Sequence, residues 1–138
     1  MAYGLYGAAA LICPVLDARR GQVYTGIYRF EKEFVVQTPQ CAMDVRELAG
    51  ELNRLGERVI FLGDGVPVYG GRLREALQVP CDFAPAHLCR QRAAAVAALG
   101  AVYYRQGKVE TAAEHAPDYL RKSQAEREME AKNGQMGQ

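Results

Sequence analysis

A strand-like run that ends in an aspartate and then turns through two arginines is the first place where this sequence could do chemistry. Residues 11–17, LICPVLD, are followed by the turn Ala-Arg-Arg-Gly, residues 18–21, and the extended pattern resumes in QVYTGIYRF, residues 22–30. A glycine-containing turn after an acidic strand end can bring main-chain N–H groups close to a phosphate. Three interpretations of Arg19 and Arg20 remain open: a plain hairpin turn with its glycine at positive φ, a contact with a partner protein, or a contact with phosphate or RNA.

A second candidate anion site is the Gly-Asp-Gly sequence at residues 63–65. It follows the apolar run RVIFL, residues 58–62, and Pro67, two residues after it, is a typical first-turn residue of a helix. Amide groups at a helix N-terminus bind anions well. The segment lacks the Lys and Ser/Thr of a phosphate-binding P-loop, which favours a tight turn and helix cap.

Metal and nucleophile chemistry have little support in the residue pattern. The four cysteines form no Cys-x-x-Cys pair, and Cys81, His87 and Cys89 lack an evident fourth ligand, so buried reduced thiols are favoured over zinc. His115 is the second of two histidines, and neither has a recognisable nucleophile or base beside it. We expect no catalytic residue, no metal and no cofactor.

The surrounding pattern predicts a mixed α/β sheet with packed helices. Strands are expected over residues 11–17, 22–30, 33–38 and 58–62, with a shorter one near 79–83. Apolar residues at helical spacing predict a helix over 45–55, capped by Asp44 with Glu47 completing a capping box and ended by Gly56. Further helices are expected over 67–77 and 86–106, the second with these buried positions: Leu88, Val96, Leu99, Val102 and Tyr103.

Length and charge limit the function classes. The 138 residues suffice for one domain, and 17 Lys and Arg against 16 Asp and Glu give a net charge of +1. A domain that holds nucleic acid by itself usually has a clear basic excess, so strong direct nucleic-acid binding is not expected. Residues 1–16 are uncharged but are shorter than a membrane span and interrupted by Gly and Pro, so we expect a helix end, no membrane contact and a cytoplasmic protein.

Three segments, taken in order, resemble a known family. VLDARRGQVYTGIY, GDGVPVY and PDYLRKSQAER are similar to the C-terminal lobe of TsaB (YeaZ), the bacterial protein needed to make threonylcarbamoyladenosine in tRNA. The resemblance covers residues 11 to about 127 and implies an RNase H-like lobe of the actin/hexokinase ATPase superfamily. It divides the chain into the end of an interlobe helix at 1–10, the lobe at 11–127 and a disordered charged and polar tail at 128–138.

The resemblance also implies a role. It implies a non-catalytic scaffold fragment whose complete protein pairs with a TsaD-like catalytic protein and a TsaE-like ATPase. A preceding lobe with a Gly-Pro-Gly-Ser-Phe-Thr-Gly stretch has no counterpart here. Partner contacts are predicted for Arg19 and Arg20, because arginine is favoured at interfaces. By resemblance to the family's last motif, Arg121, Gln124 and Glu126 are expected to order the tail or to contact another subunit. The alternatives are a residual ATPase or metallopeptidase-like enzyme of the same superfamily, and a small module that homodimerises through AYGLYGAAAL, residues 2–11. The plain packing interpretation of PDYLRKSQAER is that Tyr119 and Leu120 dock into the core and the charged residues stay outside.

Overall fold

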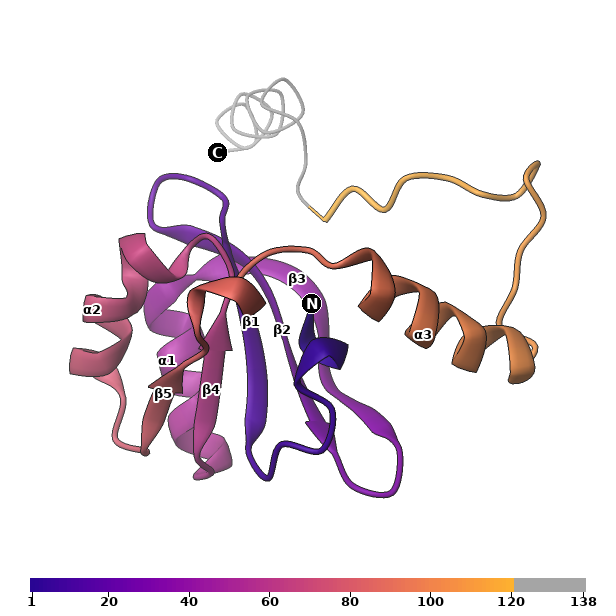
Figure 1. The fold of residues 1–138 in the computed structure, drawn as a ribbon. Helices are drawn as coiled ribbons and strands as arrows, with labels where there is room; N and C mark the ends of the chain where they lie inside the picture. The colour runs from indigo at the N-terminus through magenta and orange to yellow at the C-terminus, as the bar shows by residue number, and fades with distance from the viewer. Residues whose placement is uncertain (121–138) are drawn as a thin grey trace, which may run out of the picture.

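The computed structural model describes residues 1–120, and their strands form a five-stranded mixed sheet in the order β3-β2-β1-β4-β5 (Figure 1). β1 pairs antiparallel with β2 and parallel with β4. β2–β3 is antiparallel and β4–β5 is parallel, so the predicted mixed sheet is confirmed. In chain order the elements are η1 (Ala2–Leu5, a 3-10 helix), β1 (Leu11–Asp17), β2 (Gln22–Phe30), β3 (Phe34–Asp44), α1 (Val45–Leu55), β4 (Val59–Leu62), α2 (Val66–Ala76), β5 (Cys81–Phe83), η2 (Ala86–Leu88, 3-10) and α3 (Ala93–Arg105).

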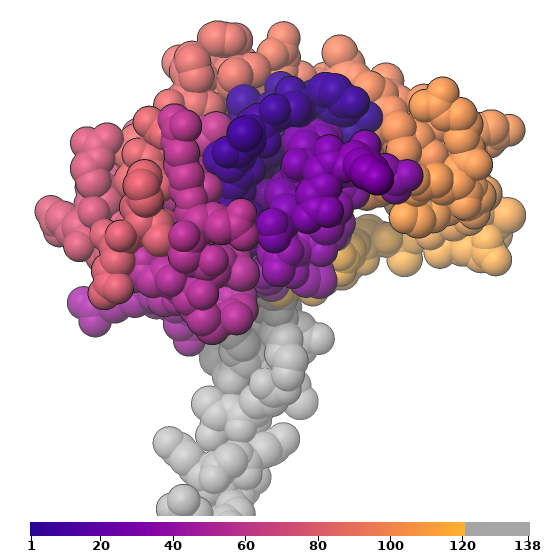
Figure 2. Space-filling model, turned by 90° about the horizontal axis from the view of Figure 1, so that it is seen from below, coloured from indigo at the N-terminus to yellow at the C-terminus, as the bar shows by residue number. Residues whose placement is uncertain are grey.

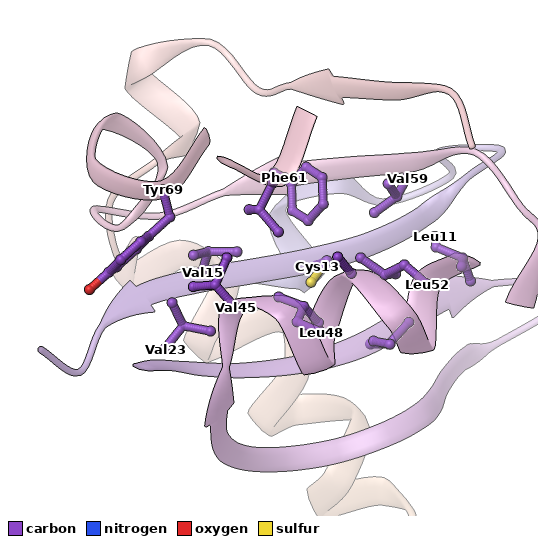
Figure 3. Close-up of a cluster of buried hydrophobic side chains, with 13 residues drawn as sticks. Leu11, Cys13, Val15, Val23, Val45, Leu48, Leu52, Val59, Phe61 and Tyr69 are labelled. Atoms are coloured by element: carbon purple, nitrogen blue, oxygen red, sulfur yellow. The ribbon is translucent and has the colours of Figure 1, made fainter. Parts of the chain in front are cut away.

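One face of the sheet carries the main core. α1 and α2 cover this face, and Leu48 and Leu52 of α1 meet Val15, Val23 and other strand residues that are fully buried (Figure 3). Burying a side chain of this size stabilises the fold by about 1.5–3 kcal/mol. This core fixes both helices against the end of β1.

The predicted boundaries of α1 are confirmed by its caps. The Asp44 side chain accepts a hydrogen bond from the Arg46 amide at 2.8 Å, and the Asp44 amide donates to Glu47 Oε2 at 3.2 Å. Gly56 ends the helix at φ 71°. The Asn53 side chain then links α1 to the end of α2, because it donates to the Ala76 carbonyl oxygen and accepts from the Gln78 amide.

The prediction that the third strand stops at Pro39 is wrong. β3 continues to Asp44 and pairs with β2 on both sides of the proline, with Thr38 opposite Ile27 and Cys41 opposite Thr25. The register shifts between these two pairs, and β3 is the edge strand of the sheet. A proline is tolerated there because an edge strand leaves one side unpaired and a bulge removes the need for its missing N–H.

The other face of the sheet is covered loosely. The N-terminal segment forms only the short helix η1, and Figure 2 shows this part of the chain, in indigo, lying at the surface between the purple β2–β3 hairpin and the orange residues around α3. α3 packs mainly against η1 and contains no buried residue. Within residues 1–120, no helix has both the length and the apolar character to cross a membrane.

The prediction of one helix over 86–106 is wrong both in where the helix begins and in which of its residues are buried. The chain forms the 3-10 turn η2, an irregular stretch, and then α3 from Ala93. The five residues predicted to be buried are only half-buried or, in the case of Val96, 66% exposed. An alanine-rich sequence favours helix intrinsically but offers few large side chains to dock, so its helical tendency carries little information about packing.

Candidate functional site

The turn that follows β1 has an unusual backbone. Arg19, Arg20 and Gly21 all have positive φ, at 66°, 56° and 79°. The positive φ predicted for Gly21 is confirmed, whereas those of the two arginines were not foreseen. A left-handed conformation costs a non-glycine residue about 1–2 kcal/mol, so the turn must be held by contacts around it.

Asp17 supplies the main contact that holds this turn. Its Oδ1 accepts one hydrogen bond from the Arg19 amide at 2.7 Å and another from the Tyr69 hydroxyl at 2.8 Å. These bonds, the Arg19 amide first, hold the pKa of Asp17 below its ordinary value, and the nearby carboxylate raises the pKa of Tyr69. Arg19 Nη1 lies 3.5 Å from Asp17 Oδ2, at the exposed side of the carboxylate.

Tyr69 was not identified from the sequence. It lies on α2, its ring packs at the edge of the core with the hydroxyl directed outward (Figure 3), and only 4% of its surface is exposed. The one available signal is that a buried tyrosine needs a partner for its hydroxyl. That signal does not identify an aspartate 52 positions away.

The Gly-Asp-Gly loop packs its own backbone against the end of β1. The Gly65 amide donates to the Val15 carbonyl oxygen at 2.9 Å, and Asp64 Oδ1 accepts from the Asp17 amide at 3.2 Å. A Cβ on Gly63, which has φ 118°, would lie 2.2 Å from that same Val15 oxygen. The glycines therefore allow a close approach of two segments of the chain, which favours the tight turn and cap over the anion site.

Most amides of the β1–β2 turn also donate hydrogen bonds to acceptors within the chain. The Ala18 amide donates to the Gln22 carbonyl oxygen, and the Gln22 amide donates to that of Arg19. The Gly21 amide lies near the Tyr69 hydroxyl and offsets part of the rise in the pKa of that hydroxyl. With the Arg19 amide on Asp17, three of the donors that could have cradled a phosphate already have acceptors within the chain.

The predicted site residues do not form one cluster. Arg19 lies beside Asp17, whereas Arg20 faces a cleft beside α1 and α2. Arg121, Gln124 and Glu126 fall outside the described residues, as does the predicted tail. The expected docking of Tyr119 is wrong, because its surface is 83% exposed, while Leu120 is half-buried. The segment before them meets the edge strand through a 2.9 Å hydrogen bond from Gln40 to Asp118.

The two histidines lie in separate segments and do not join this site. His87 belongs to η2 and is exposed, and His115 Nδ1 contacts Glu110 Oε1 at 2.6 Å on the surface. Cys89, near His87 in sequence, directs its thiol to the Ala84 carbonyl oxygen. Across residues 1–120 no group of three or more His, Cys, Asp or Glu side chains is arranged to hold a metal ion.

Comparison with known proteins agrees with the resemblance noted in the sequence. No family model matches the chain. It is 31% identical over 119 residues to the tRNA threonylcarbamoyladenosine biosynthesis protein TsaB of Bacillus subtilis, a match that covers 84% of this chain and 49% of that protein.

Two solved structures from Pseudomonas aeruginosa share the fold at 22% identity. The first, an uncharacterized protein similar to peptidase YeaZ, has a TM-score of 0.64 over 87% of this chain and 53% of its own. The second, YeaZ itself, has a TM-score of 0.61 over 86% and 53%. The expected RNase H-like fold is therefore shown, and the chain spans about half the length of the proteins that it matches. In sequence and in fold, this chain is similar to the TsaB (YeaZ) proteins.

Proposed function

We propose that the chain is the C-terminal lobe of a TsaB-type protein and acts as a non-catalytic scaffold in the modification of tRNA to threonylcarbamoyladenosine. The complete protein would support a TsaD-type catalytic partner and work with a TsaE-type ATPase in the cytoplasm. The match to TsaB supports the pathway. The observation that carries the non-catalytic role is the β1–β2 turn, where the amides and the Asp17 carboxylate bind one another.

The scaffold role can be tested by reconstitution. The full-length protein that contains this chain would be combined with a TsaD-type protein, a TsaE-type ATPase, ATP, the threonylcarbamoyl donor and unmodified tRNA. We expect modification only when the TsaD-type protein is present. An Asp17→Asn variant is expected to retain at least half of the wild-type rate, because this carboxylate stabilises the turn and takes no part in the transfer. Transfer by the full-length protein alone would refute the proposal.

The alternative that the protein is an enzyme can be tested by measuring ligand binding. An ATPase or metallopeptidase of this superfamily must bind nucleotide or metal, so calorimetry with Mg-ATP and with zinc addresses it directly. We expect no saturable heat with either. Micromolar binding of Mg-ATP that is lost in the Asp17→Asn variant would favour the ATPase.

A homodimer remains a proposal with one supporting observation. Tyr6, in the segment AYGLYGAAAL, has 74% of its surface exposed, and its ring contacts Tyr3 and Phe30. Exposed apolar patches tend to find partners. Sedimentation velocity over a hundredfold concentration range, with Tyr6→Ser as the comparison, would detect the association. A monomer at every concentration would exclude it.

A further inference from the structure

The end of the sheet where β1 turns into β2 borders an open cleft of about 840 Å³. Its walls come from three places in the sequence: the 18–21 turn, the first turn of α1 and the second half of α2. Each wall contributes one arginine, namely Arg20, Arg46 and Arg72. Since the core and the Asn53 bridge fix both helices, the three guanidinium groups are presented by a rigid frame.

These three arginines share one cleft, and in the described part of the chain none of them has the carboxylate partner that several other arginines on the surface have. Arg19, Arg54 and Arg58 each form a salt bridge with a neighbouring carboxylate. Within residues 1–120, the guanidinium groups of Arg20, Arg46 and Arg72 make no salt bridge and no side-chain hydrogen bond. Their positive charge is therefore left for a ligand.

Two carboxylates in the cleft lower its net positive charge, which limits the kind of anion that it can bind. Asp44 caps α1 through the Arg46 amide, and Glu75 stands one turn of α2 beyond Arg72, so the lining charges sum to about +1. A lining charge of about +1 is too small to balance a dense row of phosphates, and the chain as a whole lacks the basic excess of an RNA-binding domain. Separate, singly charged carboxylates can meet the guanidinium groups one by one in bidentate pairs.

We propose that this cleft docks an acidic segment of a protein partner, whose Asp or Glu side chains bind Arg20, Arg46 and Arg72. The inference deepens the proposed scaffold role and rests on it for the identity of the partner class. It also gives the two arginines of the turn different roles. Arg20 contacts the partner, whereas Arg19 belongs to the Asp17 contact that shapes the turn.

The test uses this chain and a fluorescein-labelled peptide of four Glu-Ala repeats, followed by fluorescence anisotropy at 20 mM and at 200 mM NaCl. The variant R20Q/R46Q/R72Q removes the three cleft charges. The matched control R90Q/R92Q/R105Q removes three exposed arginines outside the cleft, so both variants have the same net charge. Thermal melts followed by circular dichroism check that the variants fold. The single variant R72Q changes an exposed position of α2, so its peptide affinity cannot be affected by a change in the conformation of the 18–21 turn.

An exposed ion pair changes an affinity by about two- to threefold, so three pairs together predict a loss of about tenfold. We expect that loss in R20Q/R46Q/R72Q, about a twofold loss in R72Q, and less than a threefold change in the control. Peptide binding that fails at low salt, or falls equally in both triple variants, would overturn the inference. So would displacement of the peptide by tripolyphosphate or tRNA at lower concentrations than by unlabelled peptide. Because this assay contains no TsaD-type protein, its failure leaves the reconstitution result unaffected, and the two proposals can fail separately.

Discussion

Replacing Gly63 with alanine tests whether the Gly-Asp-Gly loop serves the fold of the chain. In the folded chain the new Cβ would lie 2.2 Å from the Val15 carbonyl oxygen and 2.9 Å from its carbon, both main-chain atoms that cannot rotate away. Gly63 also has φ 118°, a conformation that alanine strongly disfavours. The backbone must therefore move at the point where β1 meets α2.

Two contributions set the size of the effect. The positive φ costs an alanine at least about 1–2 kcal/mol, and forcing extra volume into a packed site costs about 1–3 kcal/mol. We expect Gly63→Ala to lower the free energy of unfolding by about 2–5 kcal/mol, against about 5–15 kcal/mol for a typical domain. With a urea m-value of about 1.5 kcal/mol/M, the unfolding midpoint should fall by more than about 1 M.

Gly71→Ala is the matched control. Gly71 lies in the interior of the same helix that the loop precedes, and a Cβ added there meets nothing within 4 Å. Alanine should stabilise this position by about 0.5–1 kcal/mol, because it is the better helix former. Both variants are measured by urea unfolding followed by circular dichroism. If Gly63→Ala unfolded within about 0.5 kcal/mol of wild type, the close approach to Val15 would be wrong, and the glycines would be free to serve a ligand.

Three further predictions concern the turn and the core. Arg20→Gly should raise the free energy of unfolding by up to about 1 kcal/mol because it removes a left-handed arginine, whereas Gly21→Ala at φ 79° should lower it by about 1–2 kcal/mol; urea unfolding separates the signs. The folded-state pKa of Asp17 lies below its ordinary value of 3.8, so its stabilising effect is present above that pH and is lost as the pH falls through the folded pKa. The wild-type advantage over Asp17→Asn in urea should accordingly shrink between pH 5 and about pH 2, and a constant difference would contradict the carboxylate's role. Burial raises the pKa of Cys13 to about 12, so iodoacetamide at pH 8 should modify Cys13 only after unfolding, as read by peptide mass spectrometry; labelling in native buffer would show that β1 is not buried.

The sequence predicted best the elements whose signals are local. The capping box of Asp44 and Glu47, the glycine at the end of α1 and the apolar spacing between them all lie within one helix, and the structure confirms each. A glycine inside a strand is typical of a close approach, and the Tyr28 hydroxyl lies over Gly26 in the middle of β2. In each case the information needed is carried by residues a few positions apart.

The errors arose where tertiary context decides the outcome. A proline usually ends a strand, but Pro39 is accommodated in an edge strand at a bulge. Whether a strand lies at the edge depends on the order of the strands in the sheet, which the local sequence does not show. The alanine-rich region after residue 86 forms a helix only from Ala93, and its large side chains find no core to enter. The link from Asp17 to Tyr69 joins a strand end to a helix, and no local pattern encodes it.

The arrangement around Asp17 explains why the β1–β2 turn is poorly suited to hold a phosphate. A phosphate site requires amides that are aligned and unoccupied, so that the ligand is the partner that satisfies them. Here the Asp17 carboxylate accepts from the Arg19 amide and from the Tyr69 hydroxyl, and a phosphate would have to displace this carboxylate before it could bind the Arg19 amide. The same two bonds stabilise the left-handed turn that places Arg20 on the cleft side and Arg19 on the Asp17 side. The hydrogen bonds within the turn therefore disfavour nucleotide binding, and the same bonds place Arg20 at the cleft.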